Sequence, residues 1–158
     1  LVQALIISRL DYCNALYYGL PQTLLNRLQR IQNSAARLVC KIAKKDHITP
    51  ALKDLHWLPV SERIKFKIIL LTHNSLNERG PAYIADLLSY YQPSRPLRSA
   101  GKNLLVVPRH KTAGFGLRSF EVSAPILWND LPIHLRECTN VDSFKKFLKT
   151  HLFKGYFN

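Results

Sequence analysis

The chain has 158 residues, of which 47% are hydrophobic, so it is long enough for one domain with a buried core. Lys and Arg number 23 against 10 Asp and Glu, and the net charge of +13 indicates a polyanionic partner. The longest uncharged run, residues 12–26, is broken by Gly19 and Pro21, so we expect no transmembrane helix and no membrane partner. Because the chain starts at Leu1 and contains no Met, we expect it to be a piece of a longer protein.

Apolar residues in the N-terminal half recur at helical spacing, and Gly or Pro separates the runs. Residues 1–18 predict a first helix, whose apolar positions are Val2, Ile6, Leu10, Cys13 and Leu16. Residues 22–44 predict a long helix with an apolar stripe confined to about 80° of arc, which we expect to face the core. The stripe consists of Leu24, Leu28, Ile31, Ala35, Leu38 and Ile42.

A basic stripe runs beside the apolar one on the same predicted helix. No Asp or Glu lies between Tyr12 and Lys45 to balance it. The stripe can be the solvated outer side of a core helix, or a surface that contacts phosphate groups. It consists of Arg27, Arg30, Ser34, Arg37, Lys41 and Lys44.

Shorter helices are predicted up to residue 88, and the character of the sequence changes after it. Pro50 and Pro59 each predict the start of a helix, and a further short helix is expected over residues 81–88. Residues 87–120 contain six cations and no acid, interleaved with Tyr90, Tyr91 and Phe115, whose rings could stack on unpaired bases. Within this stretch, residues 104–107 predict one short strand.

The C-terminal part predicts two closing helices. Residues 118–128 form the first, which Pro125 must break unless it lies in the first turn. A capping box at Thr139 starts the second, residues 141–153, with Phe144, Phe147, Leu148 and Leu152 facing inward. We therefore expect a mainly α fold: a helical bundle over residues 1–88, a loop-rich segment with a possible short β-hairpin over residues 89–120, and closing C-terminal helices over residues 121–158.

No pattern typical of catalysis or metal binding stands out. Cys13, Cys40 and Cys138 are odd in number and far apart, which favours neither a disulfide framework nor a zinc site. The six Asp residues never occur as an adjacent pair, although two-metal polymerase chemistry needs clustered carboxylates. Phosphate-binding Gly-rich motifs and the nucleophile elbow are also missing from the sequence. We expect no catalytic residue, no metal and no cofactor.

Seven strings follow one another along nearly the whole chain. They are SRLDYCN (8–14), LQRIQNSAAR (28–37), LHWLPV (55–60), PAY with DLL (81–88), VPR (107–109), APILWNDLP (124–132) and SFKKF (143–147). Together they resemble the C-terminal thumb and post-thumb region of reverse transcriptases from non-LTR (LINE-type, jockey-like) retrotransposons. The resemblance implies a parent RNA-directed DNA polymerase whose catalytic carboxylates lie upstream of this chain, and a helical thumb that grips the template–primer duplex.

We therefore expect a non-catalytic fragment that binds RNA or an RNA–DNA hybrid, joined to an upstream polymerase domain, in the nucleus or cytoplasm of the cell. A structural or protein-interaction module is one alternative, and a non-functional relic of a transposable element is another. The candidate nucleic-acid-binding residues are Arg27, Arg30, Arg37, Lys41, Lys44, Arg95, Arg98, Lys102, Arg109, Lys111 and Arg118.

Overall fold

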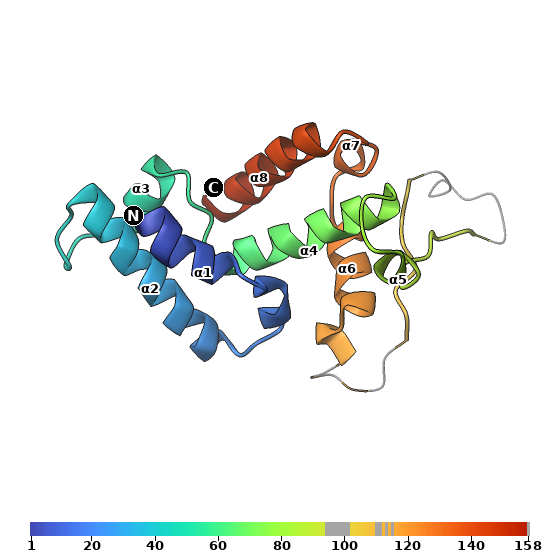
Figure 1. Cartoon of the computed structure of the whole chain (residues 1–158), viewed down its shortest axis with the longest axis horizontal. Helices are drawn as coiled ribbons and strands as arrows, with labels where there is room; N and C mark the ends of the chain where they lie inside the picture. The colour runs from blue at the N-terminus through green and yellow to red at the C-terminus, as the bar shows by residue number, and fades with distance from the viewer. Residues whose placement is uncertain (94–101, 110–111, 113, 115, 158) are drawn as a thin grey trace. The chain divides into compact units, whose positions relative to one another are not determined.

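The computed structural model describes residues 1–93, 102–109, 112, 114 and 116–157, and these residues are mainly helical, as the sequence predicts (Figure 1). They divide into two compact units, residues 1–65 with 151–158 and residues 66–150. Two long helices, α4 (Val60–Leu76) and α8 (Val141–Phe157), contribute residues to both units. The three segments expected from the sequence stay a prediction.

The first unit is built around one long helix. Its elements are a π-helical turn (Gln3–Ile7), α1 (Ser8–Asp11), a 3-10 turn (Asn14–Tyr17), α2 (Gln22–Cys40) and α3 (Thr49–Asp54). Helix α2 packs against the π-helical turn and against α3 (Figure 1). The buried apolar residues of this unit are Ile7, Leu10, Ala35, Ala36, Ala51, Leu52, Leu58, Val60, Ile64 and Leu152.

The first helix is shorter than the sequence predicts. Tyr12 is extended, and Cys13 has a φ of 48°, a left-handed conformation that an α-helix cannot continue through. Leu16, expected on the buried stripe, is therefore outside the helix and 74% exposed.

Helix α2 ends at Cys40, so its predicted end at residue 44 is wrong. Lys41 is left-handed with a φ of 53°, and its N–H bonds to the Arg37 carbonyl. The N–H of Ile42 reaches the same carbonyl at 3.2 Å, which closes the helix. Ile42 and Lys44 consequently lie beyond the helix rather than on its faces.

The prediction that the apolar stripe of α2 faces the core is wrong for part of the stripe, although Ala35 is buried and Leu28 half-buried. Gln32 is fully buried, together with Ala35 and Ala36. Three residues of the stripe lie on the outside instead: Leu24 is 41% exposed, Ile31 49% and Leu38 70%. The helix is therefore rotated about its axis relative to the predicted orientation.

Hydrogen bonds explain this rotation. The Gln32 side chain donates to the Leu58 carbonyl at 2.8 Å, and Oε1 of Gln29 accepts the N–H of Val60 at 2.8 Å. The Val60 N–H stands at the start of α4, where no helical carbonyl is available to it. Gln29 also donates to Gln32 at 2.9 Å, so the two amides form one network that turns this side of α2 inward.

The second unit combines parts of α4 and α8 with shorter elements. These are α5 (Ala82–Ala85), a 3-10 turn (Gly116–Arg118), α6 (Phe120–Asn129) and α7 (Ile133–Arg136). Trp128, expected in the core, is 1% exposed. The other buried apolar residues of this unit are Ile68, Ile69, Leu105, Val122, Ala124, Leu131, Leu135, Phe144 and Leu148.

The segment predicted as a strand forms a single antiparallel bridge. Tyr90 pairs with Leu105, and the Tyr91 N–H donates to the Leu104 carbonyl at 2.8 Å. Within the described residues the bridge does not extend into a β-strand. The possible hairpin is therefore present only as this one bridge.

Asn129, at the end of α6, holds the bridge against the core. Its side-chain amide accepts the N–H of Leu105 and donates to the carbonyl of Leu105, both at 2.8 Å. The Trp128 indole donates to the Asn103 carbonyl at 2.8 Å. These side chains satisfy backbone groups of Asn103 and of the buried Leu105 on the side where no second strand pairs with the segment.

The closing helices form with differences from the prediction. Helix α6 continues through Pro125, because the carbonyl that loses its N–H partner there belongs to the exposed residue Glu121. The cap of α8 is Asn140 rather than Thr139, since Oδ1 of Asn140 accepts two first-turn N–H groups at 3.0 Å. Phe147, expected to face inward, is 54% exposed.

Replacing Gln32 by Ala should destabilise the fold by about 1–3 kcal/mol, because it leaves the buried Leu58 carbonyl without a donor. Gln22→Ala is the matched control, since Gln22 is exposed on the same helix and its side chain bonds to the exposed Asn26 of that helix. Urea unfolding of both variants measures the difference. Equal midpoints for the two variants would contradict this role of Gln32.

His73 is buried in an aromatic cluster of the second unit. Its ring stacks on Phe144 with the centroids 3.9 Å apart and lies 6.4 Å from that of Trp128. Nε2 donates to the Cys138 carbonyl at 2.7 Å. Burial lowers the pKa of His73 below its ordinary value of 6.5, and this outweighs the opposing effect of hydrogen bonding.

Stability should therefore fall as the pH drops below about 6.5, because the unfolded chain takes up a proton at residue 73 that the folded protein resists. The free energy of unfolding, measured by urea titration between pH 7.5 and pH 5, should show this decline. His73→Phe should flatten it, whereas His134→Phe, at an exposed position, should not. An unchanged pH dependence in His73→Phe would assign the effect to another group.

Candidate nucleic-acid interface

The predicted site residues are divided between the two units. Arg27, Arg30, Arg37, Lys41 and Lys44 belong to α2 and the segment after it, in the first unit. Lys102, Arg109 and Arg118 belong to the second unit. Three predicted cations, Arg95, Arg98 and Lys111, lie outside the described residues, as does Phe115.

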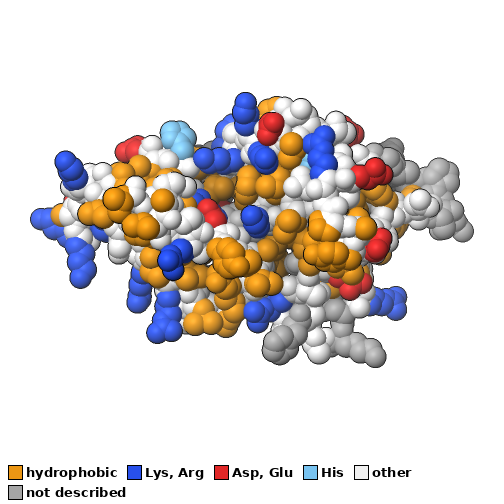
Figure 2. All heavy atoms as spheres, viewed as in Figure 1, with side chains coloured by type: hydrophobic (Ala, Val, Ile, Leu, Met, Phe, Trp, Pro, Cys, Tyr) orange, Lys and Arg blue, Asp and Glu red, His pale blue; other side chains and the backbone are white. Residues whose placement is uncertain are grey.

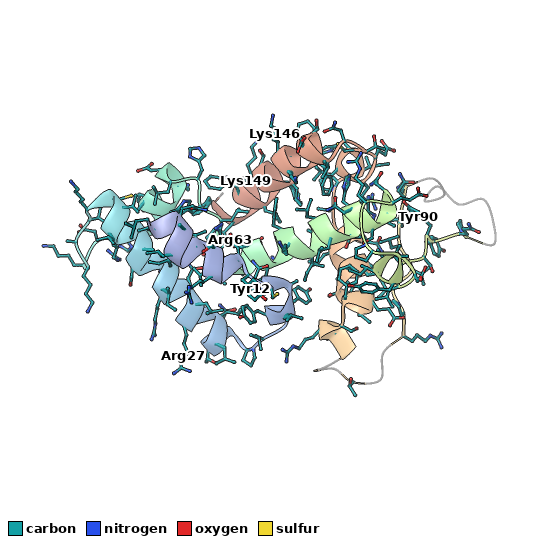
Figure 3. The ribbon with its side chains drawn as sticks, viewed as in Figure 1. Tyr12, Arg27, Arg63, Tyr90, Lys146 and Lys149 are labelled. Carbon is teal, nitrogen blue, oxygen red and sulfur yellow. The ribbon has the colours of Figure 1, made fainter. Side chains whose placement is uncertain are left out.

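The cations of α2 form the denser surface. Arg27 and Arg30 are exposed, and Arg27 points away from the helix (Figure 3). Lys and Arg side chains gather over α2 and the segment after it in the space-filling view (Figure 2). Within the described part of the chain, ion pairs engage other cations, such as Arg63, which lies 3.0 Å from Asp11. None of these ion pairs within the described residues involves a cation of α2.

A row of aliphatic side chains runs beside these cations. We call Leu24, Ile31 and Leu38 the aliphatic ridge. Arg27 lies three residues after Leu24 and four before Ile31, so it stands next to the ridge on the helix surface. The inward rotation of Gln32 thus brings apolar and basic groups onto one exposed face of α2.

Arg37 differs from the other cations of α2 because the fold uses its guanidinium group. The group donates to the Asp46 carbonyl at 2.7 Å and also to the Ala43 carbonyl. The N–H of Ala43 in turn donates to the Asp46 carboxylate at 3.2 Å. Arg37 therefore holds the turn after α2 in place, in addition to supplying charge.

An open hollow of about 440 Å³ lies at the end of α2. Two aliphatic side chains and three cations surround it, and no carboxylate takes part in its lining. This combination suits an anionic group that also carries apolar surface. The lining residues are Ser34, Arg37, Leu38, Lys41, Ile42 and Lys44.

The surface of the second unit combines cations with aromatic rings. Lys102 and Arg109 are exposed, and Arg118 is half-buried. Tyr90 is 50% exposed and Tyr91 43%, so both rings are accessible for stacking. Burial raises the pKa of Tyr90 above its ordinary value of 10.0, so its phenol stays neutral at physiological pH.

The described residues offer little for metal chemistry. Nowhere among them do three His, Cys, Asp or Glu side chains gather closely enough to hold a metal ion.

In the same part of the chain, each helix is too short or too polar to cross a membrane.

Sequence reasoning missed the amides that orient these surfaces. Gln29 and Gln32 lie three residues apart on α2, and Asn129 follows a core tryptophan. Their partners are Val60, Leu58 and Leu105, which lie 24 to 31 residues away along the chain. Gln29 and Gln32 lie on the side of α2 opposite its basic stripe, and this position is a signal in the sequence for a polar contact there. It does not reveal which residues they bind.

No protein-family model matches the chain, and no curated protein or solved structure matches it either. The likeness to reverse transcriptases rests on the seven sequence strings.

Arg37→Ala should destabilise the protein by about 1 kcal/mol, because two backbone carbonyls lose their donor. Arg30→Ala removes the same charge from the same helix at an exposed position and should change stability by less than about 0.5 kcal/mol. Urea unfolding distinguishes the two variants. Equal stabilities would show that the turn does not depend on Arg37.

Proposed function

We propose that this chain is a non-catalytic part of a retrotransposon-type reverse transcriptase and binds template–primer nucleic acid through the basic side of α2. The observation that carries the proposal is an acid-free run of cations on α2 and just after it, of which Arg27 and Arg30 are exposed on the helix and Lys41 and Lys44 are exposed beyond its end. The sequence resemblance supports the choice of an RNA or RNA–DNA hybrid as ligand. On this proposal an upstream polymerase domain supplies the catalysis, and the protein works in the nucleus or cytoplasm.

The spacing of the cations suits a phosphate backbone. From Arg27 to Lys41 the helix rises by about 20 Å, at 1.5 Å per residue. Phosphates on one strand of a nucleic-acid duplex follow each other every few ångströms along the axis, so several lie within this length. Cations that contact them release condensed counterions, which contributes affinity without reading the base sequence.

The second unit offers an auxiliary contact. Lys102 and Arg109 are exposed, and Tyr90 and Tyr91 of the same unit are exposed as well. Base stacking on such rings contributes about 1–3 kcal/mol per unpaired base. We assign this surface to a single-stranded stretch of template, and α2 to the duplex.

The double variant Arg27→Ala/Arg30→Ala should bind a 20-base-pair RNA–DNA hybrid more weakly than the unmodified chain. In a fluorescence anisotropy titration from 50 to 300 mM KCl, the slope of log affinity against log salt should flatten by about 1–2, because up to two phosphate contacts are lost. Arg37 is left unchanged, since its loss would also affect stability.

Lys146→Ala/Lys149→Ala is the matched control. Both lysines are exposed on α8 (Figure 3), and the variant loses the same charge. Its salt slope should change less than that of the α2 variant. A flattened slope in the control, with an unchanged slope in Arg27→Ala/Arg30→Ala, would place the interface elsewhere.

A further inference from the structure

The apolar stripe of α2 has the spacing of a coiled-coil seam. Its residues alternate at intervals of four and three, which is the pattern of positions a and d in a heptad repeat. One row of this seam, Leu28 and Ala35, is covered within the first unit. The other row is the aliphatic ridge, with one residue every seven positions.

The ridge is open along the whole helix. Leu24 is 41% exposed, Ile31 49% and Leu38 70%. Single exposed leucines are ordinary on protein surfaces, but three in register over two heptads form a continuous apolar strip about 20 Å long. In a coiled coil, residues at these positions insert between the side chains of a facing helix.

Charge distinguishes between the partners that could cover the ridge. Arg27 flanks the open row on the helix, Lys41 follows the end of the helix three residues after Leu38, and α2 contains no acidic residue. A second copy of α2 would bring these cations against their own kind. Nucleic acid matches the charge, but its hydrated backbone offers no apolar side chains to interlock with the ridge. A helix with acidic residues beside its apolar seam matches both features.

We propose that the aliphatic ridge docks an acidic amphipathic helix of another protein, with its carboxylates beside Arg27 and Lys41. This goes beyond nucleic-acid binding and does not depend on it. Because Arg27 belongs to both surfaces, the helix and a nucleic acid compete for α2. The partner therefore acts as a regulator that displaces nucleic acid from this face.

The probe is a labelled 21-residue peptide of three heptads, with Leu at positions a and d, Glu at e and g, Ala elsewhere and both ends blocked. With the labelled peptide held at a nanomolar concentration, its fluorescence anisotropy should rise as the unmodified chain is added, which shows binding. The same peptide with Lys in place of every Glu should bind at least about tenfold more weakly, because like charges then face each other. An unlabelled 20-base-pair RNA–DNA hybrid should displace the acidic peptide.

Leu38→Ser tests the ridge, and Leu16→Ser is its matched control, because Leu16 is 74% exposed in the same unit but off α2. Leu38→Ser should weaken peptide binding, and Ile31→Ser/Leu38→Ser should weaken it at least about tenfold, with hybrid binding unchanged. Leu16→Ser should bind normally. Thermal unfolding confirms that each variant is folded.

Three results would overturn the inference. The first is equal peptide binding by Ile31→Ser/Leu38→Ser and Leu16→Ser. The second is a loss of hybrid binding in the ridge variant, which would make the ridge part of the nucleic-acid site. The third is a concentration-dependent dimer in sedimentation that Ile31→Ser/Leu38→Ser abolishes, because a second copy would then cover the ridge. If the peptide binds to the ridge and the hybrid does not bind at all, the docking of the helix stands, whereas the proposed function fails and the competition with nucleic acid fails with it.

Discussion

In both units a residue outside the helices is buried, Leu58 in the first and Leu105 in the second, and backbone groups at these points need hydrogen-bond partners that no β-sheet provides. In the first unit, Gln29 and Gln32 supply them to the segment that enters α4. In the second, the Asn129 amide bonds to both backbone groups of Leu105. An unsatisfied buried group costs about 1–3 kcal/mol, comparable to burying a leucine side chain, so these amides can decide which side of a helix faces inward.

This constraint shapes the surface of α2. Because Gln29 and Gln32 are directed inward, aliphatic residues that would otherwise pack into the core stand beside the basic stripe. The resulting face has two properties that seldom serve one ligand, a strong positive charge and an apolar ridge. We assign the charge to phosphate and the ridge to a helix, and Arg27 links the two because it contributes to both.

Much of the helical framework could be predicted from local signals. Proline and glycine positions located α4, and apolar spacing located α2 and α8. The errors lie where a distant partner decides. The orientation of α2 depends on hydrogen bonds to Leu58 and Val60. The position of Leu105 depends on hydrogen bonds to Asn129. The periodicity of the sequence cannot reveal these long-range partners. The role of Arg37 in the turn after α2 was hidden for the same reason, since the sequence shows its charge but not the carbonyls that it binds.

The most direct test of the account is an amide chemical-shift titration of the ¹⁵N-labelled chain with a 20-base-pair RNA–DNA hybrid. The account predicts that the largest shifts lie on the exposed side of α2, around Arg27 and Arg30, with the buried neighbours of Gln32 changing less. Shifts confined to α8 or to other parts of the second unit, with α2 unchanged, would contradict it.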